Sequence, residues 1–197
     1  ILGMPMLGLL LNRIKKTSLI DVTIVATSDK QKDDEIAKYA NKEENVIVYR
    51  GDENNVLSRM FSAAEEYELS YILRVTADNP FFDWQIADQL IDMITNQEYD
   101  YIANNIVPSF PYGIDLEVMT YKALSIAHSN AKSDFEREHV TPYIRKNVKI
   151  FRLGSLENSV DLSHMRLTVD DKTDYKNAIT IFEKFGIDVT FREIPKS

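Results

Sequence analysis

Short apolar runs rich in β-branched residues alternate with longer amphipathic stretches along the whole sequence. The runs at 22–26, 46–49 and 71–75 predict buried strands, because they are short, apolar and bounded by polar residues. Between the last two, residues 55–67 place apolar side chains three and four positions apart, which predicts a helix. Strands that alternate with helices predict an α/β domain with a mostly parallel sheet covered by helices on both faces.

The same reading gives the remaining elements. Helices are predicted at 4–16, 33–39, 84–94, 121–129, 134–146 and 174–185, and strands at 101–103, 114–119, 150–153 and 166–169. Pro142 should break the helix in which it lies, and Asp83 should cap the helix that follows it. The irregular region from 104 to 152 is expected to carry an antiparallel excursion and a substrate or dimer surface.

Composition limits the classes of function. The chain has 197 residues, which fits one domain, and no cysteine, which excludes thiolate zinc sites. Its formal net charge of −8 argues against nucleic acid as a partner. No apolar run is long enough for a membrane helix, so no membrane partner is expected. The lack of cysteine suits a reducing compartment, and we expect a cytoplasmic protein.

Two acidic residues follow two predicted strands. Asp78 comes after the strand at 71–75, and Asp170 comes after the strand at 166–169. Parallel strands place their carboxyl ends on one rim, where open α/β sheets bind ligands. Two carboxylates there can hold magnesium and leave its other positions to phosphate and water. The alternative is that an Asp at such a position only caps the helix that follows. We favour capping for Asp174, which stands at the start of a helical pattern. We favour a functional role for Asp78, because Pro80 and Asp83 already supply the turn and the cap there.

The residues after the first two strands are candidates for nucleotide contacts. Ala26, Thr27 and Ser28 could let a base or ribose approach the backbone, although an ordinary strand-to-helix turn is the better interpretation of these residues alone. Arg50 could reach a nucleotide or could be a solvated loop residue.

A denser motif begins at Tyr112. Gly113 permits a tight turn, after which Asp115 and Glu117 point to one face of a strand. They could accept hydrogen bonds from sugar hydroxyls, or they could form the solvated side of an antiparallel strand.

Charged residues also occur in the helix at 134–146 and inside one strand. Arg137 or His139 could meet a sugar carboxylate, and the alternative for this charged turn is a surface ladder of ion pairs. Arg74 lies inside an apolar strand, so it needs an anionic partner, and we expect a carboxylate.

Six motifs in one order carry a family resemblance. They are Ala26-Thr-Ser, Tyr49-Arg-Gly-Asp, Arg74-Val-Thr-Ala-Asp-Asn-Pro, Tyr112-Gly-Ile-Asp-Leu-Glu-Val, Glu136-Arg-Glu-His-Val-Thr-Pro-Tyr-Ile-Arg and Leu167-Thr-Val-Asp. From about Ile1 to about Phe185 the chain resembles the acylneuraminate cytidylyltransferases, and most closely their spore coat polysaccharide biosynthesis protein F branch.

This resemblance implies a three-layer αβα fold of the nucleotide-diphospho-sugar transferase type, often dimeric. It implies transfer of CMP from CTP to a 2-keto-3-deoxy sugar acid, with release of pyrophosphate, in surface polysaccharide biosynthesis. Asp78 and Asp170 match the family's metal-binding positions, and Mg²⁺ is the expected cofactor. Ala26 and Ser28 match its nucleotide side. The regions from Tyr112 to Glu117 and from Arg137 to His139 match its sugar side.

One departure from the family concerns the beginning of the chain. The family opens with a strand and a phosphate-binding loop, and Ile1 corresponds to a position just after them. We therefore expect residues 1–197 to form one cytidylyltransferase-like domain that is N-terminally incomplete, with an open gap in its sheet. The main phosphate-neutralising residues would then lie outside these residues.

The same residues leave two alternative functions open, and they also suggest an oligomeric state. A nucleotide-sugar-dependent glycosyltransferase would use a similar sheet, but Asp78-Asn79-Pro80 has only one acid where such enzymes place two. A non-catalytic nucleotide-binding or assembly domain would not need the phosphate loop. A homodimer is expected, in which the apolar and irregular region 104–119 contributes to the interface or to a site shared across it.

Overall fold

The computed structural model describes residues 1–195, so residues 196 and 197 of the expected domain lie outside it. Its helices are α1 (Met6–Ile14), α2 (Asp34–Ala40), α3 (Val56–Glu66), α4 (Trp84–Asn96), α5 (Tyr121–Asn130), α6 (Asp134–His139), α7 (Pro142–Lys146) and α8 (Lys172–Phe185), with a short 3₁₀ turn at Gln31–Asp33. Its strands are β1 (Thr23–Ser28), β2 (Val46–Gly51), β3 (Tyr71–Arg74), β4 (Tyr101–Ala103), β5 (Glu117–Thr120) and β6 (Leu153–Ser155).

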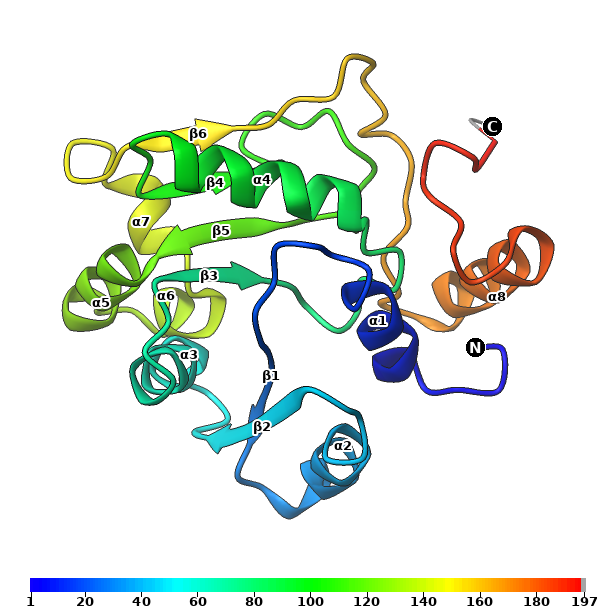
Figure 1. Ribbon diagram of the computed structural model, residues 1–197, viewed down its shortest axis with the longest axis horizontal. Helices are drawn as coiled ribbons and strands as arrows, with labels where there is room; N and C mark the ends of the chain where they lie inside the picture. Colours follow the sequence, from blue (N-terminus) through cyan, green and yellow to red (C-terminus); the bar gives the residue numbers. More distant parts are fainter. Residues whose placement is uncertain (196–197) are drawn as a thin grey trace.

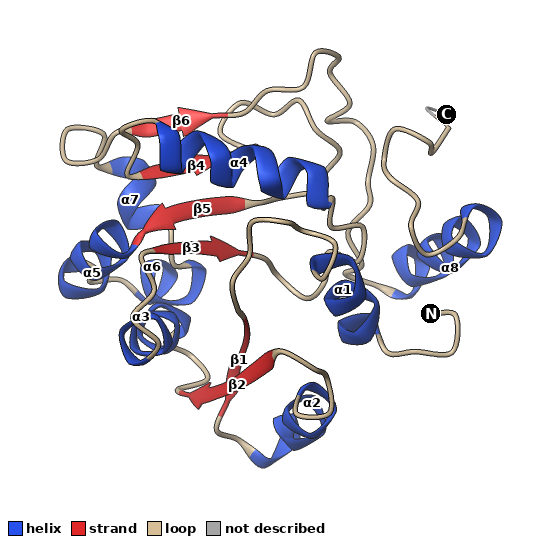
Figure 2. Ribbon diagram, viewed as in Figure 1, coloured by secondary structure: helices blue, strands red, loops and turns tan. Residues whose placement is uncertain are grey.

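The strands form two separate groups (Figures 1 and 2). β3, β5, β4 and β6 make a four-stranded sheet in that order, and β1 pairs with β2 in parallel. β5 runs antiparallel to both β3 and β4, while β4 and β6 are parallel, so β5 is the only reversed strand in the larger sheet. The expected antiparallel excursion in the region 104–152 is therefore confirmed.

Helices cover both faces of the larger sheet, which gives the expected three layers. Ile102 and Val118 point toward α4 and belong to one buried cluster, which also holds Phe81 and Phe182. Alternate residues of the same strands, such as Tyr101, point to the other face and pack with α3, α5 and α7. Because Glu117, Val118 and Met119 are all buried, β5 is covered on both faces and is not the half-exposed strand that its sequence suggests.

Several boundaries differ from the sequence-based expectation. Residues 166–169 form no regular strand: Arg166 makes a single parallel bridge with Tyr112. α8 begins at Lys172 and is capped by Asp171, so Asp174 lies inside its first turn and is not the cap. The break at Pro142 is confirmed, since α6 ends before Val140, which has a φ of 70°, and Pro142 opens α7. Asp83 caps α4 as expected, accepting hydrogen bonds from two backbone N–H groups.

An open groove of about 850 Å³ separates β1 from β3. Every residue from 20 to 26 lines one side of it, and every residue from 68 to 77 lines the other. Successive side chains of a strand point to opposite faces, so lining by all of them means that strand edges face the groove. No strand among residues 1–195 pairs with these two edges. The expected gap in the sheet is therefore confirmed.

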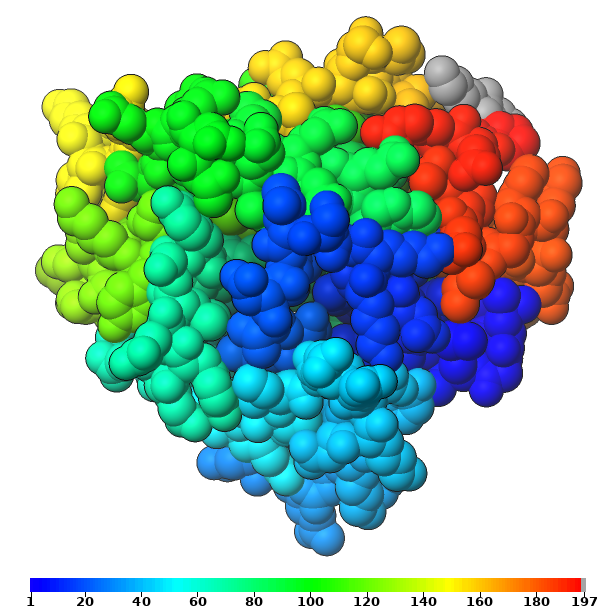
Figure 3. All heavy atoms as spheres, viewed as in Figure 1, coloured from blue at the N-terminus to red at the C-terminus, as the bar shows by residue number. Residues whose placement is uncertain are grey.

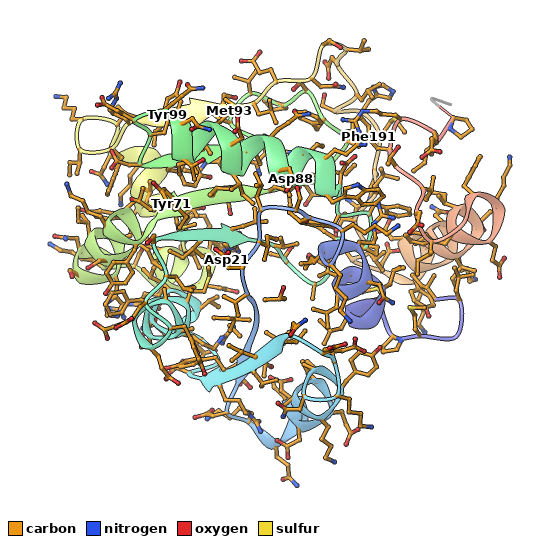
Figure 4. All side chains as sticks on the ribbon, in the orientation of Figure 1. Asp21, Tyr71, Asp88, Met93, Tyr99 and Phe191 are labelled. Atoms are coloured by element: carbon orange, nitrogen blue, oxygen red, sulfur yellow. The ribbon has the colours of Figure 1, made fainter. Side chains whose placement is uncertain are left out.

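The connection from α1 to β1 is held against α4. The carboxylate of Asp88, labelled on α4 in Figure 4, accepts hydrogen bonds from the backbone N–H groups of Ser18 and Leu19 and from the Ser18 hydroxyl. Atoms of the N-terminal residues thereby occupy the middle of one face of the molecule, between α3 and α8 (Figure 3). Among residues 1–195, no helix combines the length and apolar character needed to cross a membrane.

The fully buried Arg13 joins α1 to the C-terminal tail. Its guanidinium donates to the carbonyl oxygens of Phe82 (2.8 Å), Val189 (2.9 Å) and Ile187. Burial lowers the pKa of Arg13 to about 10, while the more distant Asp83 and Asp188 oppose that shift. One side chain thus satisfies carbonyl groups from two distant segments.

Replacing Arg13 should destabilise the whole domain. Arg13→Met leaves three carbonyl oxygens without this donor, two of them buried, so we expect the free energy of unfolding to fall by about 3 kcal/mol or more. Urea denaturation monitored by circular dichroism measures this. The control is Lys15→Met, which removes an exposed ion pair with Glu43 and should cost about 1 kcal/mol or less. Equal losses in the two variants would contradict the assigned role.

Candidate functional site

The polar residues gather where β3 and β4 end and β5 begins. Arg74, at the end of β3, lies opposite Glu117, and Glu117 lies opposite Ala103 at the end of β4. Because β5 is reversed, its first residue reaches the carboxyl ends of its neighbours. The loops beyond this rim contain Asp78 and Asp115, as an open α/β sheet requires of its ligand site.

The structure brings Asp78 and Asp170 together. The backbone oxygen of Asp78 accepts a hydrogen bond from Val169 N at 2.9 Å, which places the two acidic residues at one junction. Asp78 is half-buried, and its carboxylate accepts a hydrogen bond from the Thr76 hydroxyl. Asp170 is exposed. Carboxylates from two segments that meet in this way can supply oxygen ligands to a hard divalent cation whose other ligands are water and phosphate.

Arg166 neutralises the carboxylates on one side of this junction. It donates to both oxygens of Asp174, at 3.0 and 2.7 Å, and also to one oxygen of Asp170. These hydrogen bonds lower the pKa of Asp174 to about 2 and raise the pKa of Arg166. Asp174 is therefore committed to Arg166, and the second oxygen of Asp170 lies 3.5 Å from the Thr168 hydroxyl.

The loop that starts at Tyr112 packs directly on the segment that leads to Asp170. Gly113 has a φ of 101°, and a Cβ atom there would lie 2.2 Å from the backbone nitrogen of Thr168, so only glycine fits. Asp115 accepts hydrogen bonds from Gly113 N (3.1 Å) and from the Asn105 amide (2.9 Å). Tyr112 is 53% exposed, and the Arg166 guanidinium lies 5.3 Å from its ring centroid.

Glu117 is buried, contrary to the expectation that it faces a sugar with Asp115. Its carboxylate accepts hydrogen bonds from Arg74 (2.6 Å), from the Thr141 hydroxyl (2.8 Å) and from the Tyr101 hydroxyl. Burial raises the pKa of Tyr101, and the nearby Glu117 carboxylate raises it further. The carboxylate partner expected for Arg74 is thus confirmed, and Glu117 is a structural residue.

The residues expected on the nucleotide side are largely engaged within the fold. Thr27 and Ser28 are the last two residues of β1, and both are buried. The Ser28 hydroxyl accepts from Lys30 N (3.1 Å) and donates to Asp33, as in the turn that was the better interpretation of these residues. Arg50 donates to Ser28 O (2.8 Å), to Lys30 O and to Asp34, so it fastens the loop after β1. Of this group, Ala26 lines the groove.

Arg137 and His139 lie on the outside of α6. Arg137 has a weak contact with Asp134 at 3.8 Å, and the His139 ring packs on Phe135, which is 61% exposed. The buried acid of this helix is Glu136, which accepts the backbone N–H groups of Lys132 and Ser133 and pairs with Lys146 on α7. These contacts lower the pKa of Glu136 to about 2, with the Lys146 hydrogen bond as the largest cause.

Sequence reasoning did not single out Arg145, which lies against the loop after β4. This arginine of α7 donates through Nη2 to the backbone and side-chain oxygens of Asn105, at 3.1 and 2.8 Å. The predicted helix at 134–146 placed Arg145 two turns beyond Arg137. After the break at Pro142, α7 lies against the loop that follows β4. The proline predicts the break, but it does not predict the direction that α7 takes.

Comparisons with known proteins agree on one family. The family model described as Cytidylyltransferase matches residues 1–192. The chain is 36% identical over 192 residues to an uncharacterized protein of Methanocaldococcus jannaschii, MJ1063, and 34% identical over 190 residues to the spore coat polysaccharide biosynthesis protein SpsF of Bacillus subtilis. These alignments cover 95% and 92% of this chain and 77% of each relative.

Two solved structures have the same architecture. A cytidylyltransferase from Leptospira borgpetersenii superposes with a TM-score of 0.92 and 29% identity, over 97% of this chain and 81% of that one. A CMP:2-keto-3-deoxy-manno-octonic acid synthetase in complex with CTP superposes with a TM-score of 0.69, over 93% of this chain and 90% of that one. At 12% identity the second match supports the fold alone.

The Glu136 cluster should make stability depend on acid pH. Its pKa in the folded state, about 2, lies below the ordinary value, so its stabilisation is complete above about pH 4.3 and disappears as the pH falls toward 2. Glu136→Gln should lower the free energy of unfolding by about 1 kcal/mol at pH 7, and this difference should shrink between pH 5 and pH 2. Urea denaturation at several pH values measures it, with the exposed Glu138→Gln as control. A difference that stays constant down to pH 2 would argue against this role.

Proposed function

Because the chain belongs to the cytidylyltransferase family and is an enzyme of that class, we propose that it transfers CMP from CTP to an acidic sugar. Pyrophosphate is the second product. The relative SpsF is named for spore coat polysaccharide biosynthesis, and a structural neighbour is named for a CMP-sugar acid and contains CTP. The first name supports a role in surface polysaccharide biosynthesis, and the second supports a sugar acid as acceptor.

One observation carries the proposal: Asp78 and Asp170, far apart in sequence, meet at the carboxyl rim through the hydrogen bond from Val169 N to Asp78 O (2.9 Å). We assign them the Mg²⁺ of the reaction, because hard oxygen ligands with room for water and phosphate are what this ion prefers. When bound, the ion would neutralise charge on the triphosphate and polarise the phosphate that is attacked.

The chain's own residues then bind and orient the two substrates. The proposed nucleotide side is the end of β1, where the backbone of Ala26, Thr27 and Ser28 can face the base and ribose, and Arg50 holds the loop that follows. The proposed acceptor side is the loop of Tyr112, Gly113 and Asp115, which contacts the segment that leads to Asp170. In the reaction a sugar hydroxyl attacks the α-phosphorus of CTP, the bond from that phosphorus to the bridging oxygen of the β-phosphate breaks, pyrophosphate leaves, and the hydroxyl proton passes to solvent.

The rival glycosyltransferase would take a nucleotide-sugar instead of a free triphosphate. The turn after β3 offers only one acid, Asp78, where such enzymes place two. The next residue, Asn79, is buried, and its amide donates to the Thr76 hydroxyl. Screening pyrophosphate release with four nucleoside triphosphates and several sugar acids separates these functions. Release that requires both CTP and a sugar acid supports the proposal, whereas none with any pair supports the rival or a binding domain.

The metal assignment predicts the behaviour of two variants. In the full-length protein, Asp78→Asn and Asp170→Asn should each reduce kcat for pyrophosphate release by about 100-fold or more, because each removes a negatively charged metal ligand. Their folds should be unchanged by circular dichroism. Chelation of divalent ions should abolish wild-type turnover, and added Mg²⁺ should restore it.

Asp171→Asn is the matched control for these variants. Asp171 neighbours Asp170 and caps α8 by accepting the backbone N–H groups of Thr173 and Asp174. Asn is nearly as good a cap, so this variant should keep near-normal turnover. Near-normal rates for Asp78→Asn or Asp170→Asn as well would reduce both acids to caps or turn residues and would refute the shared-metal site.

We further propose that the protein is a homodimer whose interface includes the region 104–119. Within this region, Phe110 is buried inside the chain against Phe191, which Figure 4 labels. Val107 and Tyr112 remain 44% and 53% exposed. Light scattering at micromolar concentration should give the dimer mass, and Val107→Glu should shift it toward the monomer. Monomer mass alone for the wild type would contradict the dimer.

A further inference from the structure

Arg145 is held rigidly but is only partly used by the fold. Its Nη2 group donates to both oxygens of Asn105, and its guanidinium lies 6.0 Å from the ring centroid of Tyr101. Tyr101 is fully buried and is itself fixed by its hydrogen bond to Glu117. The position of the guanidinium is therefore set from two sides, by an amide and by an aromatic ring.

The remaining donors of Arg145 have no partner among residues 1–195. Its Nε and Nη1 groups make no hydrogen bond there, and it forms no ion pair within the described chain, although its side chain is only half-exposed. Most of the other arginines are paired with carboxylates: Arg50, Arg74, Arg137, Arg152, Arg166 and Arg192. In a chain with a net charge of −8, a fixed guanidinium without a carboxylate is unusual.

Arg145 belongs to the same rim as the proposed acceptor loop. Asn105, which it contacts, lies two residues beyond the end of β4. The Asn105 amide donates to Asp115, Asp115 accepts from Gly113 N, and Gly113 packs on Thr168 beside Asp170. Hydrogen bonds thus lead from Arg145 through Asn105 to Asp115 and Gly113, and the packing of Gly113 on Thr168 places this loop beside the segment that carries Asp170.

We propose that Arg145 binds the carboxylate of the acceptor sugar. This inference rests on the proposed function, and it names the residue that would distinguish an acidic sugar from a neutral one. A guanidinium presents parallel N–H groups that match the two oxygens of a carboxylate, and the fixed position of Arg145 reduces the entropy lost on binding. The triphosphate has its own place at Asp78 and Asp170, so the guanidinium across the loop is available to the acceptor.

This assignment replaces the expectation that Arg137 or His139 meets the sugar carboxylate. Both of those side chains lie on the outer surface of α6 and have only weak or aromatic contacts that fix them. Arg145 is instead anchored to the loop that adjoins the acceptor residues. The two arginines therefore make a matched pair for experiment.

The test compares an acid with its ester in wild-type protein and variants. The probes are 2-keto-3-deoxy-manno-octonic acid, N-acetylneuraminic acid and the methyl ester of each, with binding measured by calorimetry in the full-length protein. Wild-type protein should prefer at least one acid over its ester by about 10-fold or more, the scale of a charge-assisted pair. Arg145→Gln should remove most of this preference and leave CTP binding unchanged, Arg145→Lys should restore part of it, and Arg137→Gln should keep it.

The outcomes separate this inference from the proposed function. If the acid preference survives in Arg145→Gln, or if wild-type protein prefers no acid over its ester, the role of Arg145 is refuted even where CTP-dependent pyrophosphate release is observed. If wild-type protein prefers an acid through Arg145 but releases no pyrophosphate from any triphosphate, the binding role stands and the proposed reaction fails. Thermal melting checks that Arg145→Gln is folded, and an intact preference in a destabilised variant also counts against the role.

Discussion

The carboxylate of Glu117 is the interaction on which the arrangement of the rim depends. It is almost fully buried and receives hydrogen bonds from Arg74 on β3, Tyr101 on β4 and Thr141 before α7. A buried charge is tolerated only when it is paired and its oxygens are satisfied, so these three elements cannot shift independently. The register of β5 between β3 and β4, and with it the positions of the loops that carry Asp78 and Asp115, follows from this cluster.

The groove between β1 and β3 has the opposite character. Two strand edges with unpaired backbone groups face a cavity of about 850 Å³, and helices α1, α3 and α4 contribute side chains to its walls. The two sheet groups keep their places through packing and side-chain contacts such as those of Arg13 and Asp88. Stable proteins rarely leave strand edges open. Because β1 and β3 do not pair across the groove, no strand pairing between them stabilises this part of the described domain.

Sequence reasoning succeeded where a local rule decides the outcome and failed where the partner lies far away. An arginine inside an apolar strand must have an anion, so Arg74 could be assigned a carboxylate, and Pro142 had to break its helix. Alternation predicted that Asp115 and Glu117 share a face, but not that Tyr101 and Thr141 would cover Glu117. The choice between Arg137 and Arg145 depends on how α7 returns to β4, and no local periodicity contains that information.

The proposed role of Asp170 as a metal ligand is compatible with its contact to Arg166. The strong part of that cluster is Arg166 with Asp174, where both carboxylate oxygens accept hydrogen bonds and the Asp174 side chain is 9% exposed. Asp170 shares the outer edge of the same guanidinium with a side chain that is 46% exposed, and exposed pairs contribute about 1 kcal/mol or less. Releasing Asp170 to a cation therefore costs little, while Asp174 keeps Arg166 in place and prevents it from becoming an unpaired charge. The fold thus separates Asp174, which fastens Arg166, from the more exposed Asp170, which we have proposed as the metal ligand.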